Sequence, residues 1–267
     1  MADTQPILID DGTPGVRVIT LNRPQRLNAL DGDTLDALHA ALAESHAADS
    51  GVKAVIIQAN GRAFCSGNDL KWLASGVLTD TAAHLRNQDR MQAVFELIEN
   101  MDPIVIAAVH GHAVAGGFEL VLAADIVVVA EDAQLGDAHL PRNFLPSGGS
   151  SQRLPRRLGL SRALYYLITG RTMSGVEAER NGLAALAVPQ DVLAQAAMNL
   201  AAEIARVERG ALSAMKKLAR RALELPLQDG LALERWSQFR FRNESPSLHA
   251  SVMAFAAGNE SSEQEKT

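Results

Sequence analysis

The pattern that most constrains this chain occurs twice, with the second copy 50 residues after the first. Each copy has an apolar stretch, a turn that contains glycine, and an acidic residue followed by leucine. The recurring residues are Val55, Gly61, Ala63, Gly67, Asp69 and Leu70, which match Val105, Gly111, Ala113, Gly117, Glu119 and Leu120. Such a match can arise by chance between two β-α units, or it marks a repeated ββα element that places the two turns side by side.

The hydropathy pattern predicts an α/β core followed by a helical region. Four apolar stretches are typical of buried strands: 16–21, 52–58, 104–109 and 125–130. Helical periodicity starts at Asp31 and also covers much of 80–100, and after about residue 147 the strand signals nearly disappear. Further helices are expected over 190–207, 210–224 and 230–241. We therefore expect an α/β core over residues 1–200 and a C-terminal helical region over residues 201–267.

The composition excludes several classes of protein. The 267 residues include 25 basic and 31 acidic side chains, so a phosphate-rich polymer would meet no excess of positive charge. Cys65 is the single cysteine, which rules out an internal disulfide and a cysteine-based zinc cluster. The first residues lack the basic start and apolar run of a signal peptide, and no stretch reaches the roughly 18 apolar residues of a membrane span. We expect a cytoplasmic protein that binds neither nucleic acid nor membrane.

Two turns with few bulky side chains, 63–69 and 111–119, form the candidate site. Such turns let a substrate reach main-chain N–H groups, which at a helix N-terminus are unpaired and carry the positive end of the dipole. Two N–H groups that converge on one carbonyl oxygen form an oxyanion hole. Glycine-containing turns also occur simply where a strand packs against a helix, so the turns alone leave both interpretations open. A metal site at His110 and His112 is not expected, because no third ligand can be placed.

Longer segments around these turns resemble the enoyl-CoA hydratase/isomerase (crotonase) family, in order and spacing, over nearly the whole chain. The segments are 21–30 (LNRPQRLNAL), 63–70 (AFCSGNDL), 107–120 (AAVHGHAVAGGFEL), 124–126 (ADI), 145–149 (LPSGG), 154–156 (LPR), 167–170 (LITG) and 253–255 (MAF). The resemblance implies an α/β spiral of ββα units with a C-terminal helical trimerisation region, assembled as a homotrimer or homohexamer. It implies acyl thioesters of coenzyme A as substrates, with no metal and no cofactor beyond the CoA of the substrate.

The resemblance also implies roles for single residues. The backbone N–H groups of Asn68 and Gly116 would form the oxyanion hole. The substrate-binding residues would be Arg26, Leu27 and Ala29 at the CoA nucleotide, Asp69, Leu70 and Lys71 along the pantetheine or acyl channel, and Gly117 in the second turn. Glu119 matches the first of two glutamates that act as general acid and base in family hydratases. It can also be interpreted as a first-turn acid that stabilises a helix N-terminus.

The second glutamate of those hydratases is absent, and His139 occupies its position in the segment 134–141. An unperturbed histidine titrates near pH ~6.5, so His139 can serve as a base or an acid near neutrality. Asp137 pairs with it if both side chains point the same way on an extended segment. His139 can also line the pocket without taking part in the chemistry.

The resemblance implies an enoyl-CoA hydratase-like lyase in which Glu119 is the main acid/base and His139 assists. Three alternatives remain open. One is an enoyl-CoA isomerase, and a second is a hydrolase or C–C bond-cleaving relative that uses His139. The third is a catalytically silent member of the family that binds CoA or serves as a scaffold.

Overall fold

A computed structural model describes residues 5–245, 247–248, 250 and 252–256. The chain divides into two compact units, Met1–Arg206 and Val207–Thr267. The division falls after helix α8 (Leu193–Ile204), slightly beyond the boundary expected after residue 200, because α8 contacts three strands of the sheet in the first unit. Within the described parts of the chain, no helix combines the length and apolarity needed to cross a bilayer.

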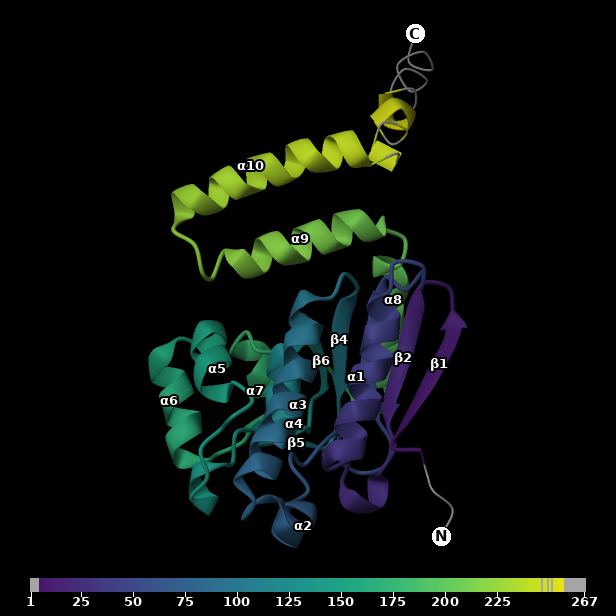
Figure 1. The fold of residues 1–267 in the computed structure, drawn as a ribbon. Coiled ribbons are helices and arrows are strands. Elements are labelled where there is room, and N and C mark those ends of the chain that lie inside the picture. The colour runs from purple at the N-terminus through teal and green to yellow at the C-terminus, as the bar shows by residue number, and fades with distance from the viewer. Residues whose placement is uncertain (1–4, 246, 249, 251, 257–267) are drawn as a thin grey trace. The chain divides into compact units, whose positions relative to one another are not determined.

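The first unit is built on a six-stranded sheet (Figure 1) with the strand order β1-β2-β3-β4-β6-β9. The strands are β1 (Ile7–Thr13), β2 (Val16–Leu21), β3 (Ala54–Ala59), β4 (Ile104–Val109), β6 (Ile126–Ala130) and β9 (Leu186–Val188). β1 is antiparallel to β2, and all other neighbours are parallel. The predicted strands correspond to β2, β3, β4 and β6, which are buried over most of their length, as parallel strands covered on both faces are.

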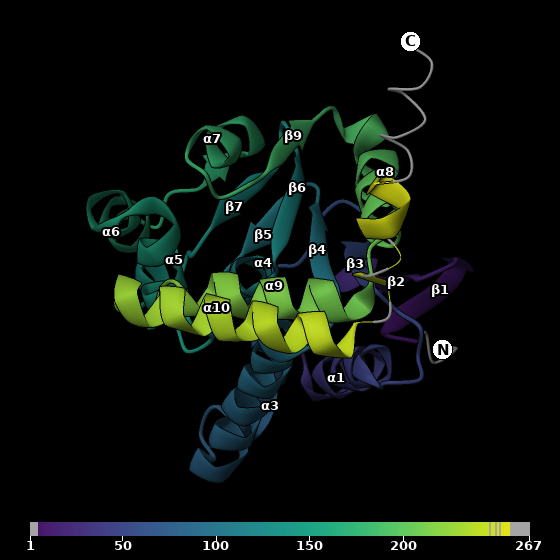
Figure 2. The same cartoon turned by 90° about the horizontal axis from the view of Figure 1, so that it is seen from above.

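Helices cover both faces of this sheet. Helices α1 (Gly32–His46) and α3 (Thr81–Asn100) lie on one face and α8 lies on the other, as Figures 1 and 2 both show. α1 begins where the Asp31 carboxylate accepts a hydrogen bond from the Thr34 N–H, and α3 begins with Asp80 in the same role. The predicted apolar face of α1, formed by Leu35, Leu38 and Leu42, is fully buried.

A smaller sheet extends the unit beside the carboxyl ends of these strands. It contains β5 (His112–Val114), β7 (Gln134–Gly136) and β8 (Met173–Ser174) in the order β5-β7-β8. The remaining helices are α2 (Leu70–Trp72), α4 (Gly116–Ala123), α5 (Ser150–Leu158), α6 (Leu160–Thr169) and α7 (Gly175–Arg180). Short helical turns occupy Pro24–Arg26, Leu73–Val77, Leu140–Arg142 and Gln190–Val192. β1, β5, β7, β8 and β9 were not expected, because β1 is polar and largely exposed and the others span at most three residues.

The 50-residue repeat is a structural repeat. β3 and β4 pair in parallel with Val55 opposite Val105, so the sequence offset equals the register of the two strands. After β3 and β4, Cys65 in the first turn pairs with Ala113 in the second turn through a parallel β-bridge. Each copy then enters a helix, α2 in the first and α4 in the second. The interpretation as a repeated ββα element with adjacent turns is confirmed.

The second unit contains two long helices, α9 (Arg209–Arg221) and α10 (Leu227–Glu244), which pack against each other. They correspond to the helices expected over 210–224 and 230–241. Glu208, which precedes α9, accepts hydrogen bonds from the hydroxyl groups of Ser245 and Ser247 beyond α10. No residue of α10 is buried, and Trp236 and Phe239 on this helix are 69% and 50% exposed.

Candidate active site

The two repeated turns meet at Gly67 and Gly116. A Cβ built on Gly67 would lie 2.8 Å from the backbone nitrogen of Gly116, and one built on Gly116 would lie 3.5 Å from the backbone nitrogen of Asn68. Within the part of the chain that the structure describes, the N–H groups of Asn68 and Gly116 donate no backbone hydrogen bond in the turns and loops. The structure therefore brings together two free amides that can bind one oxygen atom.

A strained residue precedes the second amide. Ala115 has φ 51° and ψ −124°, a conformation that residues with a Cβ adopt rarely and at a cost of about 1–3 kcal/mol. Its neighbours fix it in place, because Ala115 N donates to the carbonyl of Gly136 and Val114 N donates to that of Cys65. The strained residue directly precedes the first turn of α4, where the N–H of Gly116 has no acceptor within the helix and can bind a ligand.

Glycine is required at Gly117 for a different reason. A Cβ at this position would lie 2.2 Å from the carbonyl oxygen of Cys65, so the helix and the first turn can approach each other only without a side chain. Cys65 itself is fully buried, and burial raises the pKa of its thiol to about 12, which leaves it without thiolate character.

Glu119 lies in the first turn of α4 and is completely buried. Its Oε1 accepts hydrogen bonds from the N–H groups of Gly148, at 2.8 Å, and Ser150, at 3.2 Å. Its Oε2 has no hydrogen-bond partner among the described residues. Burial raises the pKa of Glu119, and the charge of His139 and the two N–H groups offset this shift only in part. The result is a carboxyl group with one free oxygen and a readily held proton.

His139 and Asp137 form a hydrogen-bonded pair, as their spacing allowed. The Nδ1 atom of His139 lies 2.9 Å from Oδ2 of Asp137, and the His139 N–H donates to Oδ1 of the same carboxylate at 3.2 Å. Burial by itself lowers the pKa of His139, but the hydrogen bond to Asp137 and the charges of Asp137 and Glu119 raise it above its ordinary value. Burial raises the pKa of Asp137, yet the contacts with His139 and Ser150 together outweigh this effect, and the net shift of the pKa is downward. The pair therefore favours an imidazolium next to a carboxylate.

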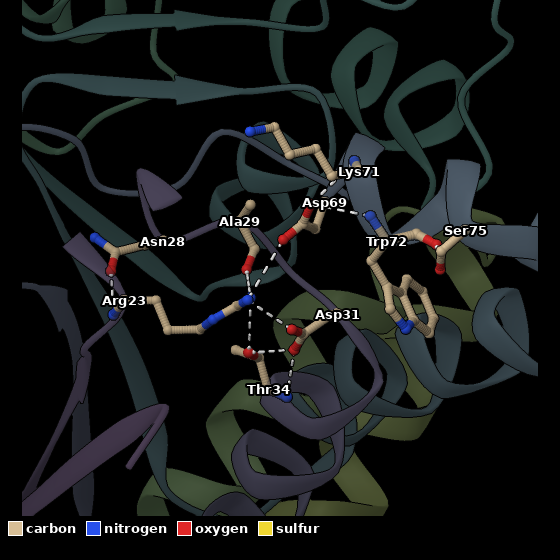
Figure 3. Close-up of polar contacts among 9 residues, drawn as sticks. All are labelled: Arg23, Asn28, Ala29, Asp31, Thr34, Asp69, Lys71, Trp72 and Ser75. Carbon is tan, nitrogen blue, oxygen red and sulfur yellow. Dashed lines mark hydrogen bonds and ion pairs between the residues drawn. The ribbon is translucent and has the colours of Figure 1, made fainter. Parts of the chain in front are cut away.

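The segments expected to bind CoA are joined by the side chain of Arg23 (Figure 3). Its guanidinium donates to the carbonyl of Ala29 at 2.6 Å and forms ion pairs with Asp31 at 2.7 Å and Asp69 at 3.4 Å. The other oxygen of Asp69 accepts from the N–H groups of Lys71 and Trp72 and so begins α2. Arg23 thereby fixes the segment 26–30 against the segment 69–71.

The expected substrate-binding residues differ in exposure. Arg26, Leu70 and Lys71 are exposed, Leu27 is half-buried, and Ala29 and Asp69 are buried. The Lys71 side chain extends away from the Arg23 network in Figure 3, whereas the Asp69 carboxylate points into it. Asp69 is thus occupied by contacts within the protein, and the side chains free to meet a ligand here are those of Arg26, Leu70 and Lys71.

Two residues of this region were not singled out from the sequence. Arg23 lies in a segment that carried the family resemblance, but nothing in that segment shows which acids it reaches. Asn87 on α3 donates through Nδ2 to Oδ1 of Asn68 at 3.4 Å and is 1% exposed. The sequence does contain a sign of Asn87, because it lies four residues before Met91 and therefore on the same, otherwise apolar, face of the helix.

A surface hollow of about 430 Å³ adjoins the site. It is lined by Gln88, Asp89, Gln92, Ala93, Glu96 and Ser147. Gln92 spans it, because its Nε2 donates to the carbonyl of Ser147 at 2.9 Å. Gly148, whose N–H binds Glu119, follows directly. The hollow therefore lies beside the segment that holds the buried carboxyl group.

Comparisons with known proteins identify relatives of this chain. The family model described as Enoyl-CoA hydratase/isomerase matches residues 11–260. A probable enoyl-CoA hydratase of Mycobacterium bovis is 36% identical over 242 residues, which cover 89% of this chain and 91% of that protein. The 2,3-dehydroadipyl-CoA hydratase of Escherichia coli is 35% identical over 240 residues, which cover 90% and 91%.

A solved structure shows the same fold. The enoyl-CoA hydratase of Bacillus anthracis superposes with a TM-score of 0.89 at 30% sequence identity, covering 95% of this chain and 97% of that one. The family match extends over most of the sequence, and the fold agrees over nearly all of it. The chain therefore belongs to the enoyl-CoA hydratase/isomerase family and is an enzyme with the crotonase fold.

Proposed function

We propose that this protein hydrates enoyl-CoA thioesters. The observation that carries the proposal is the convergence of two free backbone amides, Asn68 from the first turn and Gly116 from the second, next to the helix that carries the buried carboxyl group of Glu119. The hydratase names of the relatives from Mycobacterium bovis and Escherichia coli support the same reaction.

In the proposed reaction the two amides hold the thioester oxygen, and negative charge grows there as an enolate forms. Two such donors contribute several kcal/mol of stabilisation, because removal of one typically costs ~100- to 1000-fold in kcat. The CoA moiety would lie along the segments 26–30 and 69–71, where Arg26 and Lys71 offer exposed positive charge to its phosphates. Addition of water leaves the overall oxidation state of the substrate unchanged, so the proposed reaction needs no redox cofactor.

The proton steps use Glu119 and His139. The oxygen of a water molecule bonds to the β-carbon while its proton passes to the free Oε2 of Glu119. Protonated His139 then supplies a proton to the α-carbon, and the enolate collapses to the hydrated thioester. The proton on Glu119 restores His139 for the next cycle, so one water is added and no proton is lost. Asp137 acts as a positioning residue that keeps the Nδ1 of His139 engaged and leaves Nε2 for proton transfer.

Steady-state hydration of crotonyl-CoA and of longer or aromatic enoyl-CoA esters tests the proposal. We expect Glu119→Gln to lower kcat by ~100-fold or more, because the variant has no carboxylate to accept the proton. Glu131→Gln is the matched control, since Glu131 is exposed on the same unit, and it should behave like the wild type. An enzyme that turns over none of these esters, or a Glu119→Gln variant with wild-type rates, would contradict the proposal.

The Asp137–His139 pair favours a second candidate, in which His139 acts as the base for thioester hydrolysis or C–C bond cleavage. A histidine oriented by a buried carboxylate is the arrangement that general-base hydrolysis uses. Mass spectrometry of the products separates the two reactions. An intact thioester that has gained one water indicates hydration, whereas free CoA or a shortened acyl chain indicates cleavage.

A further inference from the structure

The buried face of α3 carries two polar side chains next to the proposed oxyanion hole. Met91, Val94 and Ile98 form an apolar stripe on this face, each at most 1% exposed. Continuing the stripe toward the start of the helix by four and seven residues leads from Met91 to Asn87 and His84. A stripe that is apolar along the core therefore becomes polar at its N-terminal end.

This polar end lies at the two turns. The Nδ2 atom of Asn87 is 3.4 Å from Oδ1 of Asn68, the residue that supplies one free amide. Met91, one helical turn further, has its sulfur 3.6 Å from where a Cβ of Gly116 would be, and Gly116 supplies the other amide. Asn87 and Met91 thus lie beside the two residues whose amides form the proposed oxyanion hole.

Both polar side chains have an unused hydrogen-bonding atom. Oδ1 of Asn87 and Nδ1 of His84 are buried and have no partner among the described residues. The Nε2 of Gln88 lies 3.2 Å from Nε2 of His84. In the neutral tautomer in which His84 Nε2 accepts this hydrogen bond, the ring proton is on Nδ1. An unpaired acceptor and an unpaired donor therefore occupy one helix face, one turn apart. Buried groups of this kind are costly unless a ligand pairs with them.

We propose that this pair recognises a hydroxyl group on the acyl chain of the substrate. A hydroxyl oxygen would accept from the His84 Nδ1–H and its proton would be donated to Oδ1 of Asn87, so one hydroxyl group offers the acceptor and the donor that these two atoms need. A ketone only accepts and leaves Asn87 unpaired. A carboxylate would place its charge against the Asn87 oxygen, and the adjoining hollow already carries Asp89 and Glu96. This inference rests on the proposed function, because it assumes that an acyl-CoA thioester binds at the two amides.

Binding of saturated thioesters, which the enzyme does not hydrate, tests the inference by calorimetry. The ligands are hexanoyl-CoA, its hydroxy derivatives at carbons four, five and six, the matching keto derivatives, and adipoyl-CoA. We expect the best hydroxy derivative to bind at least about tenfold more tightly than hexanoyl-CoA, because it pairs two buried groups that the alkyl chain leaves unpaired. The keto derivatives and adipoyl-CoA should gain no such advantage.

Variants assign the preference to its residues. Asn87→Leu and His84→Phe should each abolish the hydroxyl preference while hexanoyl-CoA still binds, and thermal melting followed by circular dichroism verifies that each variant folds. Arg86→Gln, at an exposed position between them, should keep the preference. Equal or weaker binding of every hydroxy derivative by the wild type overturns this inference alone, as does a preference that survives both variants. Failure of every thioester to bind overturns the proposed function with it.

Discussion

At the scale of single residues, the pKa values of Glu119, His139 and Asp137 depend on one another. Burial raises the pKa of Glu119, while Glu119 and Asp137 together raise that of His139 against the effect of its own burial. A raised pKa keeps His139 protonated further into the alkaline range than its ordinary value of 6.5 would allow. The favourable contribution of this charge to folding is complete below the unfolded pKa and is lost as the pH rises through the folded one.

The pH dependence of kcat/KM tests this coupling. Activity that needs protonated His139 should decline as the pH rises through its raised pKa. In Asp137→Asn the neutral amide no longer favours the imidazolium, so we expect this decline to move to lower pH. Asp132→Asn, at an exposed position nearby, is the control and should leave the profile in place. An unshifted profile in Asp137→Asn would show that the pair does not govern the proton step.

At the scale of secondary-structure elements, the site depends on how closely two turns approach. Gly67 has φ 86°, and a Cβ on it would lie 2.8 Å from Gly116 N and 2.9 Å from the Cβ of Ala115. Ala115 is itself strained, with φ 51°, so the second turn has little freedom to move away. The geometry of the two amides is therefore sensitive to a single methyl group.

Gly67→Ala should separate the turns and displace the Gly116 amide. We expect kcat to fall by ~100-fold or more, the usual effect of losing one oxyanion donor, and stability to fall by about 1–2 kcal/mol. Gly182→Ala is a matched control, because Gly182 has φ 79° but nothing within 4 Å of a built Cβ. It should show the backbone cost in urea unfolding without the loss of kcat. Equal loss of activity in both variants would mean that the approach of the turns is unimportant.

At the scale of the whole molecule, α10 carries apolar side chains that nothing within its own unit buries. Leu233, Trp236 and Phe239 recur every three residues along one side of the helix and are 37%, 69% and 50% exposed, and the helix has no buried residue. Apolar side chains gathered in this way mark an association surface more often than a free one. We propose that this helix takes part in the trimer or hexamer that the family resemblance implies.

Oligomeric state measured by light scattering after size-exclusion chromatography tests this proposal. Wild-type protein should elute as a trimer or hexamer. Trp236→Glu places a charge on the exposed apolar surface and should shift the population toward smaller species, because a buried unpaired charge opposes association. Gln238→Glu adds the same charge to the same helix at an exposed polar position and should not change the mass. A wild-type protein that is monomeric would contradict the proposal outright.

Much of the fold follows from local pattern, and the reasons for the exceptions are physical. The strands β2, β3, β4 and β6 are predictable because burial on both faces demands continuous apolar residues. The short strands β5, β7 and β8 contain two or three residues each, which is too little for any period to appear. The helices α9 and α10 are predictable in position, but the exposure of apolar residues such as Met215 and Trp236 is not, because a local pattern does not show whether a neighbour covers them.

The sequence by itself determined the repeat, the α/β plan, and the turns whose glycines allow close approach, because spacing and glycine content are local properties of the chain. The tertiary structure alone decided that Glu119 is buried with one free oxygen, that Asp137 meets His139, and that Arg23 joins two segments. It also decided that Asn87 keeps an unpaired atom beside Asn68. Burial and pairing depend on which distant residues come within a few ångströms, and no local pattern records those distances.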